Sequence, residues 1–80
     1  MTINFINPFQ FGTFREWDCI IYDDTKNVVY RTSTQFRIDD DDKIIKNTGV
    51  EIFNSQGYDS SLTLDSITID KPDSWQYINQ

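Results

Sequence analysis

The sequence predicts an all-β (mainly β) fold, and three observations carry that prediction. Ala, the best helix former, is absent, while β-branched and aromatic residues are abundant. The segment 28–38 alternates along most of its length between two sets of side chains, as a half-buried strand does. Short stretches rich in Asp, Asn or Ser separate the apolar segments. We expect one domain over residues 1–80, a small antiparallel meander of four to five strands that forms a partly closed barrel or rolled sheet.

The central hairpin is the clearest element of this prediction. Segment 14–22 is expected to be a strand that pairs with 28–38 across the turn at 23–27. One face of the first strand carries apolar residues that a core requires, namely Trp17, Cys19 and Ile21. Ile20 and Tyr22 interrupt the polar character of its other face, so we expect the end of this strand to be covered on both sides.

The flanking segments complete the expected sheet. Residues 3–6 are predicted to add an edge strand that ends at Pro8, because proline cannot donate a ladder hydrogen bond. Segment 43–53 is predicted to be a strand, with a bulge or bend at Gly49. The strand face expected here contains Ile44, Thr48, Val50 and Ile52.

The last expected strand covers 61–70, with a bulge at 65–66 or a corner between two sheets at that point. It ends at 71–72. A short C-terminal helical turn is predicted after it, capped by Asp73 or Ser74, which would dock Trp75 and Ile78 against the domain.

The composition argues against most catalytic chemistry. There is no His, so imidazole acid–base catalysis, Ser–His or Cys–His nucleophiles and His-containing zinc sites are excluded. Cys19 is the only thiol and lies in an apolar segment, where we interpret it as a core residue. The glycines lie too far apart for a phosphate-binding loop. We therefore expect a protein that is not an enzyme and needs no cofactor.

The charge balance indicates the class of partner. The net charge is −6, and phosphate backbones and anionic membranes repel such a chain. We expect a basic protein surface as the partner and no direct contact with nucleic acid or membrane. A single cysteine forms no internal disulfide, and the first residues lack a basic and apolar leader, which predicts a cytoplasmic location.

Two groups of residues are the candidate contact sites. The first is acidic and contains Asp23, Asp24, Asp39, Asp40, Asp41 and Asp42. The run 39–42 has three interpretations: a solvated turn, an acidic contact patch, or a calcium site, although an EF-hand is excluded because the required glycine is absent. The second group is Phe9 and Phe11, in a loop-like segment where aromatic residues serve as core, as binding anchors or as homodimer contacts.

These observations lead to a first hypothesis, a non-enzymatic acidic binding protein. The strong use of Ile, Asn, Asp and Lys indicates an AT-rich coding source such as a phage. The protein would then be a phage-encoded, anti-CRISPR-like inhibitor, a DNA mimic whose carboxylates occupy the phosphate sites of a host nuclease or other nucleic-acid-binding complex. The two acidic turns lie at opposite ends of the long strand, which weakens the mimic hypothesis or requires the acidic surface to run the length of the domain.

The alternative is an immunity, adaptor or assembly protein that binds a protein partner through its aromatic N-terminus and a sheet edge. A lesser alternative is a calcium-stabilised structural module.

Overall fold

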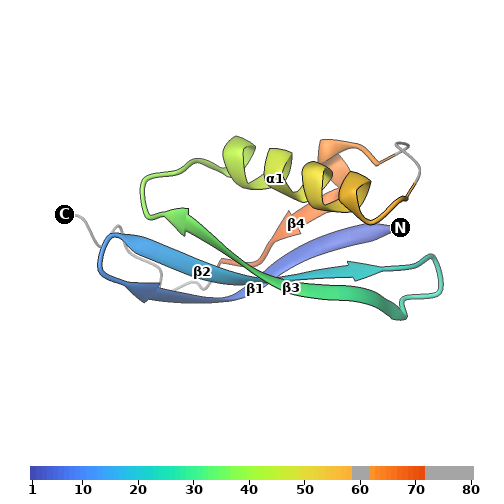
Figure 1. The fold of residues 1–80 in the computed structure, drawn as a ribbon, viewed down its shortest axis with the longest axis horizontal. Coiled ribbons are helices and arrows are strands. Elements are labelled where there is room, and N and C mark those ends of the chain that lie inside the picture. Colours follow the sequence, from blue (N-terminus) through green and yellow to red (C-terminus); the bar gives the residue numbers. More distant parts are fainter. Residues whose placement is uncertain (59–61, 72–80) are drawn as a thin grey trace.

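A computed structural model describes residues 1–58 and 62–71. Its elements are the strands β1 (Thr2–Phe11), β2 (Phe14–Tyr22) and β3 (Val28–Arg37), the helix α1 (Asp42–Ser55), the 3₁₀ turn η1 (Leu64–Ser66) and the strand β4 (Ile67–Ile69). The four strands form one sheet in the order β3-β2-β1-β4 (Figure 1). The mainly β class and the four-strand count are therefore confirmed.

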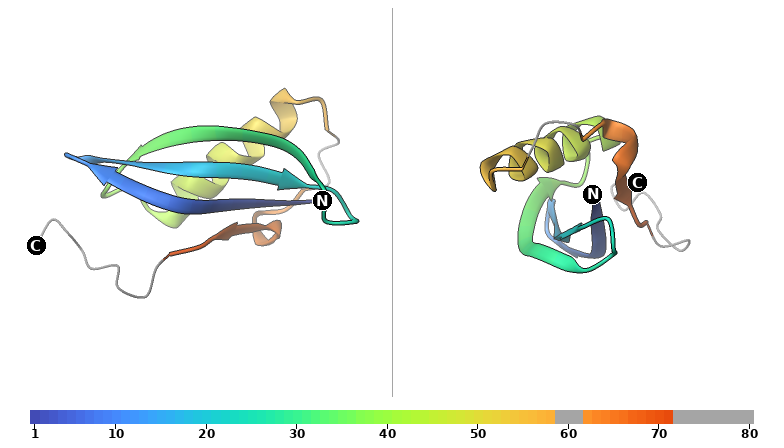
Figure 2. Two further views of the ribbon diagram at one scale, coloured as in Figure 1. Left: turned by 90° about the horizontal axis from the view of Figure 1, so that it is seen from below. Right: turned by 90° about the vertical axis from the view of Figure 1, so that its right-hand side faces the viewer.

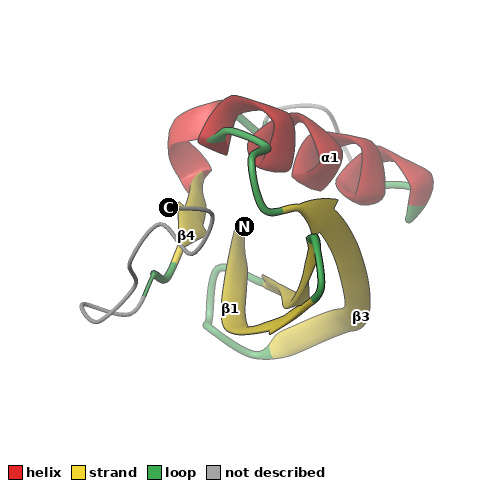
Figure 3. Ribbon diagram, turned by 90° about the vertical axis from the view of Figure 1, so that its left-hand side faces the viewer, coloured by secondary structure: helices red, strands yellow, loops and turns green. Residues whose placement is uncertain are grey.

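The sheet combines an antiparallel meander with one parallel strand. β1, β2 and β3 pair in antiparallel fashion, joined by short turns. The chain then crosses one face of the sheet as α1 and returns as β4, which pairs with β1 in parallel (Figure 1). The sheet curves around its helix-covered side, but β3 and β4 do not meet, so it is rolled and not closed into a barrel (Figure 3).

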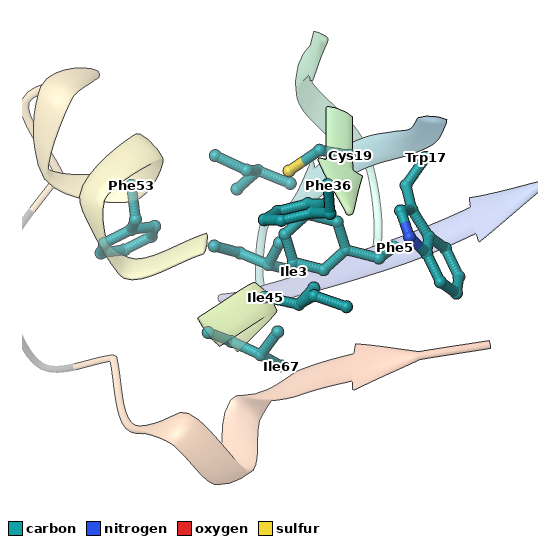
Figure 4. Close-up of a cluster of buried hydrophobic side chains, with 9 residues drawn as sticks. Ile3, Phe5, Trp17, Cys19, Phe36, Ile45, Phe53 and Ile67 are labelled. Carbon is teal, nitrogen blue, oxygen red and sulfur yellow. The ribbon is translucent and has the colours of Figure 1, made fainter. Parts of the chain in front are cut away.

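The core lies between the sheet and α1. Alternate residues of each strand point toward the helix, and their side chains fill this space (Figure 4). The expected face of β2 is confirmed, since its three predicted core residues are at most 1% exposed. The buried cluster consists of Ile3, Phe5, Trp17, Cys19, Ile21, Phe36, Ile45, Phe53 and Ile67.

The expected strand over 43–53 is wrong, because these residues belong to α1. The face that the helix buries carries Ile45, Gly49 and Phe53, which lie four residues apart, as one side of a helix requires. Asp41 caps the helix by accepting a hydrogen bond from the backbone N–H of Ile44 at 2.9 Å. The apolar face of the sheet needs a covering layer, and this segment provides it.

Gly49 is not a strand bulge but a site of close approach. A Cβ atom there would lie 3.1 Å from Cε2 of Phe5 and 3.2 Å from Cδ1 of Ile67. The absent side chain lets α1 pack closely against β1 and β4.

The N-terminal strand is longer than predicted and does not end at Pro8. β1 lies between β2 and β4, so residues 3–6 are not an edge strand as expected. A register shift between Ile6 and Phe9 accommodates the proline, with Asn7 at φ 53°. The segment 7–11 is consequently strand with a bulge and not the expected loop, while Gly12 belongs to the turn that follows.

The last strand is shorter than the predicted 61–70. Residues 62–63 are irregular, η1 follows them, and in this described part of the segment Ile67–Ile69 are the residues that pair with β1. The irregularity expected at 65–66 exists, but it is a 3₁₀ turn and not a bulge. The predicted C-terminal helical turn with Asp73, Ser74, Trp75 and Ile78 lies outside the described residues.

Candidate functional site

The two groups of predicted contact residues are distributed over the two ends of the molecule. The β1–β2 turn and the residues between β3 and α1 lie at one end of the long axis, whereas the β2–β3 turn lies at the other (Figure 1). Phe9, Phe11 and the run 39–42 consequently share one end. Asp23 and Asp24 lie at the opposite end, as the meander predicted.

Three phenylalanines form an exposed surface at the first of these ends. Phe9 is 65% exposed, and Phe11 and Phe14 are each 41% exposed. The pairing register places all three on the sheet face opposite α1, because Phe11 faces Phe14 and Phe9 faces Glu16 across the strands. Figure 2 shows this face without a covering helix. We call Phe9, Phe11 and Phe14 the aromatic surface.

The aromatic surface is ordered by contacts among its own members and one arginine. The ring centroids of Phe9 and Phe11 are 6.0 Å apart. Arg37 pairs with Phe14 across β2 and β3, and its guanidinium carbon lies 6.0 Å from the Phe14 ring centroid. An apolar surface with a cation at its edge can bind an apolar side chain of a partner and a hydrogen-bond acceptor that lies next to that side chain.

The run Asp39–Asp42 is largely occupied by local structure. Asp40 accepts the backbone N–H of Arg37 at 2.9 Å, and Asp41 caps α1. Asp42 stands in the first turn of the helix, where the helix dipole favours a carboxylate, and forms an ion pair with Lys71 at 2.7 Å. The run is therefore more than a solvated turn, because three of its four side chains form a hydrogen bond or an ion pair where the chain enters α1.

Asp39 differs from the other three members of the run. Its side chain is exposed, as are those of Asp41 and Asp42, but it forms no hydrogen bond or ion pair with the described residues, and it borders a shallow depression with Thr13, Arg37 and Ile38. A second depression begins beside it and is lined by the rest of the run together with Lys43 and Lys71. Asp39 thus places a carboxylate next to the β1–β2 turn.

A backbone hydrogen bond joins the residue before the acidic run to the β1–β2 turn. The N–H of Ile38 donates to the carbonyl oxygen of Thr13, at 3.0 Å. This bond places the start of the acidic run against the hairpin that carries the three phenylalanines. The structure therefore brings Phe9, Phe11 and Asp39–Asp42 together as one composite end.

The acidic turn at the opposite end is a closed local motif. The Oδ1 atom of Asp23 accepts the backbone N–H groups of Asn27 and Thr25, each at 2.9 Å. The hydrogen bond from Asn27, followed by the one from the Thr25 hydroxyl, lowers the pKa of Asp23. Asp24 forms an ion pair with the N-terminal amine at 2.6 Å. Both carboxylates are therefore engaged in local structural contacts at this end of the molecule.

Phe14 and Arg37 belong to the composite end but were not among the predicted contact residues. Phe14 had been assigned to a strand, and its exposure depends on the face that α1 leaves open. The alternation of 14–22 did contain a signal, since Phe14 shares its parity with Glu16 and Asp18 and not with Trp17. Arg37 required the β2–β3 register, which the sequence does not specify.

The described residues contain a buried thiol and no cluster of metal-ligating side chains. Cys19 is fully buried, and burial raises the pKa of its thiol to about 11. The described chain contains no group of three or more His, Cys, Asp or Glu side chains positioned to hold a metal ion. The predicted core role of Cys19 is confirmed by its burial.

Comparison of the chain with protein-family models, with curated proteins and with solved structures found no match. No helix in residues 1–58 or 62–71 has both the length and the apolar character needed to cross a membrane.

Proposed function

We propose that this protein is a non-enzymatic binding protein that docks one end of its sheet against a basic partner protein. The contact consists of the aromatic surface and the adjoining carboxylate of Asp39. In this proposal Phe9 enters an apolar pocket of the partner, and Asp39 faces a Lys or Arg at its rim.

The exposure of Phe9 is the observation that carries the proposal. An aromatic side chain left 65% exposed loses much of the free energy that burial would contribute. Single exposed apolar residues are common, but three phenylalanines on one sheet face form a contiguous apolar patch of the kind found at interfaces. Rigid aromatic anchors also lose little conformational entropy when they bind.

The charge supports the choice of a basic partner. The chain carries a net charge of −6, and the run Asp39–Asp42 begins next to the β1–β2 turn, at the same end of the molecule as the aromatic surface (Figure 1). Such a field accelerates encounter with a positively charged surface. A nuclease or another nucleic-acid-binding protein has this chemistry, so our leading proposal is a phage-encoded inhibitor in the host cytoplasm whose carboxylates at one end of the domain occupy a phosphate site of that partner. An immunity or adaptor role uses the same surface on a different partner.

The proposal is tested by capture with the purified protein as bait, followed by affinity measurement with the partner identified. We expect Phe9→Ser to weaken binding by about 30-fold, the effect of losing one hot-spot anchor of about 2 kcal/mol. The matched control is Val28→Ser, because Val28 is 48% exposed but begins β3 beside the β2–β3 turn, at the opposite end of the molecule (Figure 1). Equal affinities of the two variants would contradict the proposal.

The acidic contribution is tested separately on the same complex. Asp39→Asn is expected to reduce affinity a few-fold at low salt and less at high salt, whereas Asp65→Asn, an exposed carboxylate in η1, leaves it unchanged. Competition by duplex DNA for the captured partner distinguishes the inhibitor role from the adaptor role. A partner that binds DNA and this protein at the same time excludes the mimic.

A further inference from the structure

We propose that β3 is the contact strand of a homodimer, in which two copies of this chain pair antiparallel about Ser33 and join their sheets into one. The surface is the β3 edge of the sheet, which no other strand of the described residues pairs with, and it is distinct from the aromatic surface.

The two edges of the sheet are protected to very different degrees. β4 forms one edge with three residues, flanked by η1 on one side and by Asp70 and Lys71 on the other. β3 forms the opposite edge with ten residues. Long edges expose backbone N–H and C=O groups that pair readily with another strand, and proteins usually block them with prolines, bulges or inward charges.

β3 lacks these blocking devices over most of its length. Its helix-side positions are Tyr30, Thr32, Thr34 and Phe36, none of them charged. The strand contains no proline, and the one register shift with β2 lies at its start, beside Val28. The segment 30–37 is therefore a regular, pairable edge.

The charges on the open face select the register. Two antiparallel registers use nearly all of 30–37, one centred on Ser33 and the other on Thr34. Centring on Thr34 would place Arg31 directly opposite Arg37 of the second copy, which is unfavourable. Centring on Ser33 places Arg31 opposite Gln35 instead.

The Ser33-centred register also provides charge complementarity. Gln35 donates through Nε2 to Oε1 of Glu16 at 3.4 Å, and the two residues are cross-strand partners. An Arg31 side chain laid over Gln35 of the second copy is therefore directed toward Glu16 of that copy. The two-fold symmetry forms this contact twice.

The dimer is tested by sedimentation across a dilution series of the full chain. We expect the mass to rise with concentration from one chain of 9.5 kDa to twice that value. Ser33→Lys places two cations opposite each other at the symmetry axis and should shift this transition to at least tenfold higher concentration. Asn47→Lys makes the same change of charge at an exposed position of α1. This variant should dimerise over the same concentration range as the wild type.

Oxidative cross-linking tests the register itself. In the Ser33-centred dimer the two Ser33 Cα atoms are about 4.5–5.5 Å apart, within reach of a disulfide. Two Arg31 positions are displaced by four residues, about 13 Å along the strands. We expect Ser33→Cys to form a covalent dimer and Arg31→Cys to remain uncross-linked, while the buried native Cys19 does not react.

A wild-type protein that stays monomeric throughout the series overturns the proposal. A dimer unaffected by Ser33→Lys overturns it as well, since the interface would lie elsewhere. Equal cross-linking of both cysteine variants would exclude this register. Circular dichroism of each variant, compared with that of the wild type, verifies that the fold is intact.

Discussion

Neighbouring carboxylates have different tasks in this protein. Asp40, Asp41 and Asp42 bind backbone N–H groups or a lysine, whereas the side chain of Asp39, beside the β1–β2 turn, forms no hydrogen bond or ion pair with the described residues. The path of the backbone thus gives three of these four identical residues a structural role and leaves the fourth available to contact a partner. Their effects on stability should differ accordingly.

Removing the helix cap should destabilise the protein. Asp41→Ala is expected to lower the free energy of unfolding by about 1 kcal/mol, because the N–H of Ile44 loses its acceptor. Asp39→Ala should change it by less than about 0.5 kcal/mol. Urea denaturation followed by circular dichroism measures both. Equal losses in the two variants would contradict the division of the acidic run.

Cys19 should be unreactive in the folded protein. Burial raises the pKa of its thiol to about 11, so the thiol stays protonated, and stays non-nucleophilic, until the pH approaches that value. We expect a disulfide reagent at pH 8 to label it only at the rate of unfolding, and immediately in denaturant. Rapid labelling of the native protein would show that this part of the core opens.

At the scale of elements, α1 is determined by packing more than by its composition. It contains Ile44, Ile45, Val50 and Ile52, which favour strands, yet it forms a helix because one side buries Ile45, Gly49 and Phe53 against the sheet. Gly49 has a specific part in this arrangement, since its missing side chain admits the ring of Phe5.

Adding a methyl group at this contact should not give the usual benefit of alanine in a helix. Gly49→Ala gains about 1 kcal/mol of helix propensity, but overpacking against the fully buried Phe5 costs about 1–3 kcal/mol. We expect a net loss of about 1 kcal/mol in thermal or urea unfolding. Asn47→Ala, at an exposed position of the same helix, should instead stabilise by a few tenths. A stabilising Gly49→Ala would show that the contact relaxes without cost.

At the scale of the whole molecule, α1 covers one face of a curved sheet, and no described helix covers the other, open face (Figure 2, Figure 3). The longest dimension is 40 Å, and the two acidic turns stand at its opposite ends. A continuous acidic stripe would have to follow the open face, where Glu16 and Asp18 are accompanied by Arg31 and Arg37. The geometry therefore favours a contact at one end over a mimic along the full length.

Calcium should not stabilise the fold. The carboxylates of the run 39–42 that lie closest to α1 already bind N–H groups and Lys71, and an ion would have to displace these partners. We expect the same melting temperature in excess Ca²⁺ and in EDTA. A rise of several degrees with Ca²⁺ would revive the calcium-stabilised module, and an Asp40→Asn variant would then test the ligand set.

Local patterns in the sequence were sufficient to predict the two strands of the central hairpin. Period-two alternation identified β2 and β3, and the Asp-rich linker identified the turn between them, because the side chains of a strand alternate regardless of its partners. The buried cysteine and the mainly β class followed from the same residues. Phe9 and Phe11 were recognised as candidate anchors from composition and position.

Tertiary structure decided the rest, because burial depends on which layers meet. The segment 42–55 satisfied a strand pattern and a helical one, and only the need to cover the sheet selected the helix. The passage of β1 through Pro8 depended on a bulge that pairing with β2 imposes. The union of the aromatic surface with Asp39 depended on the hydrogen bond between Ile38 and Thr13, which joins residues distant in sequence and is invisible to any local pattern.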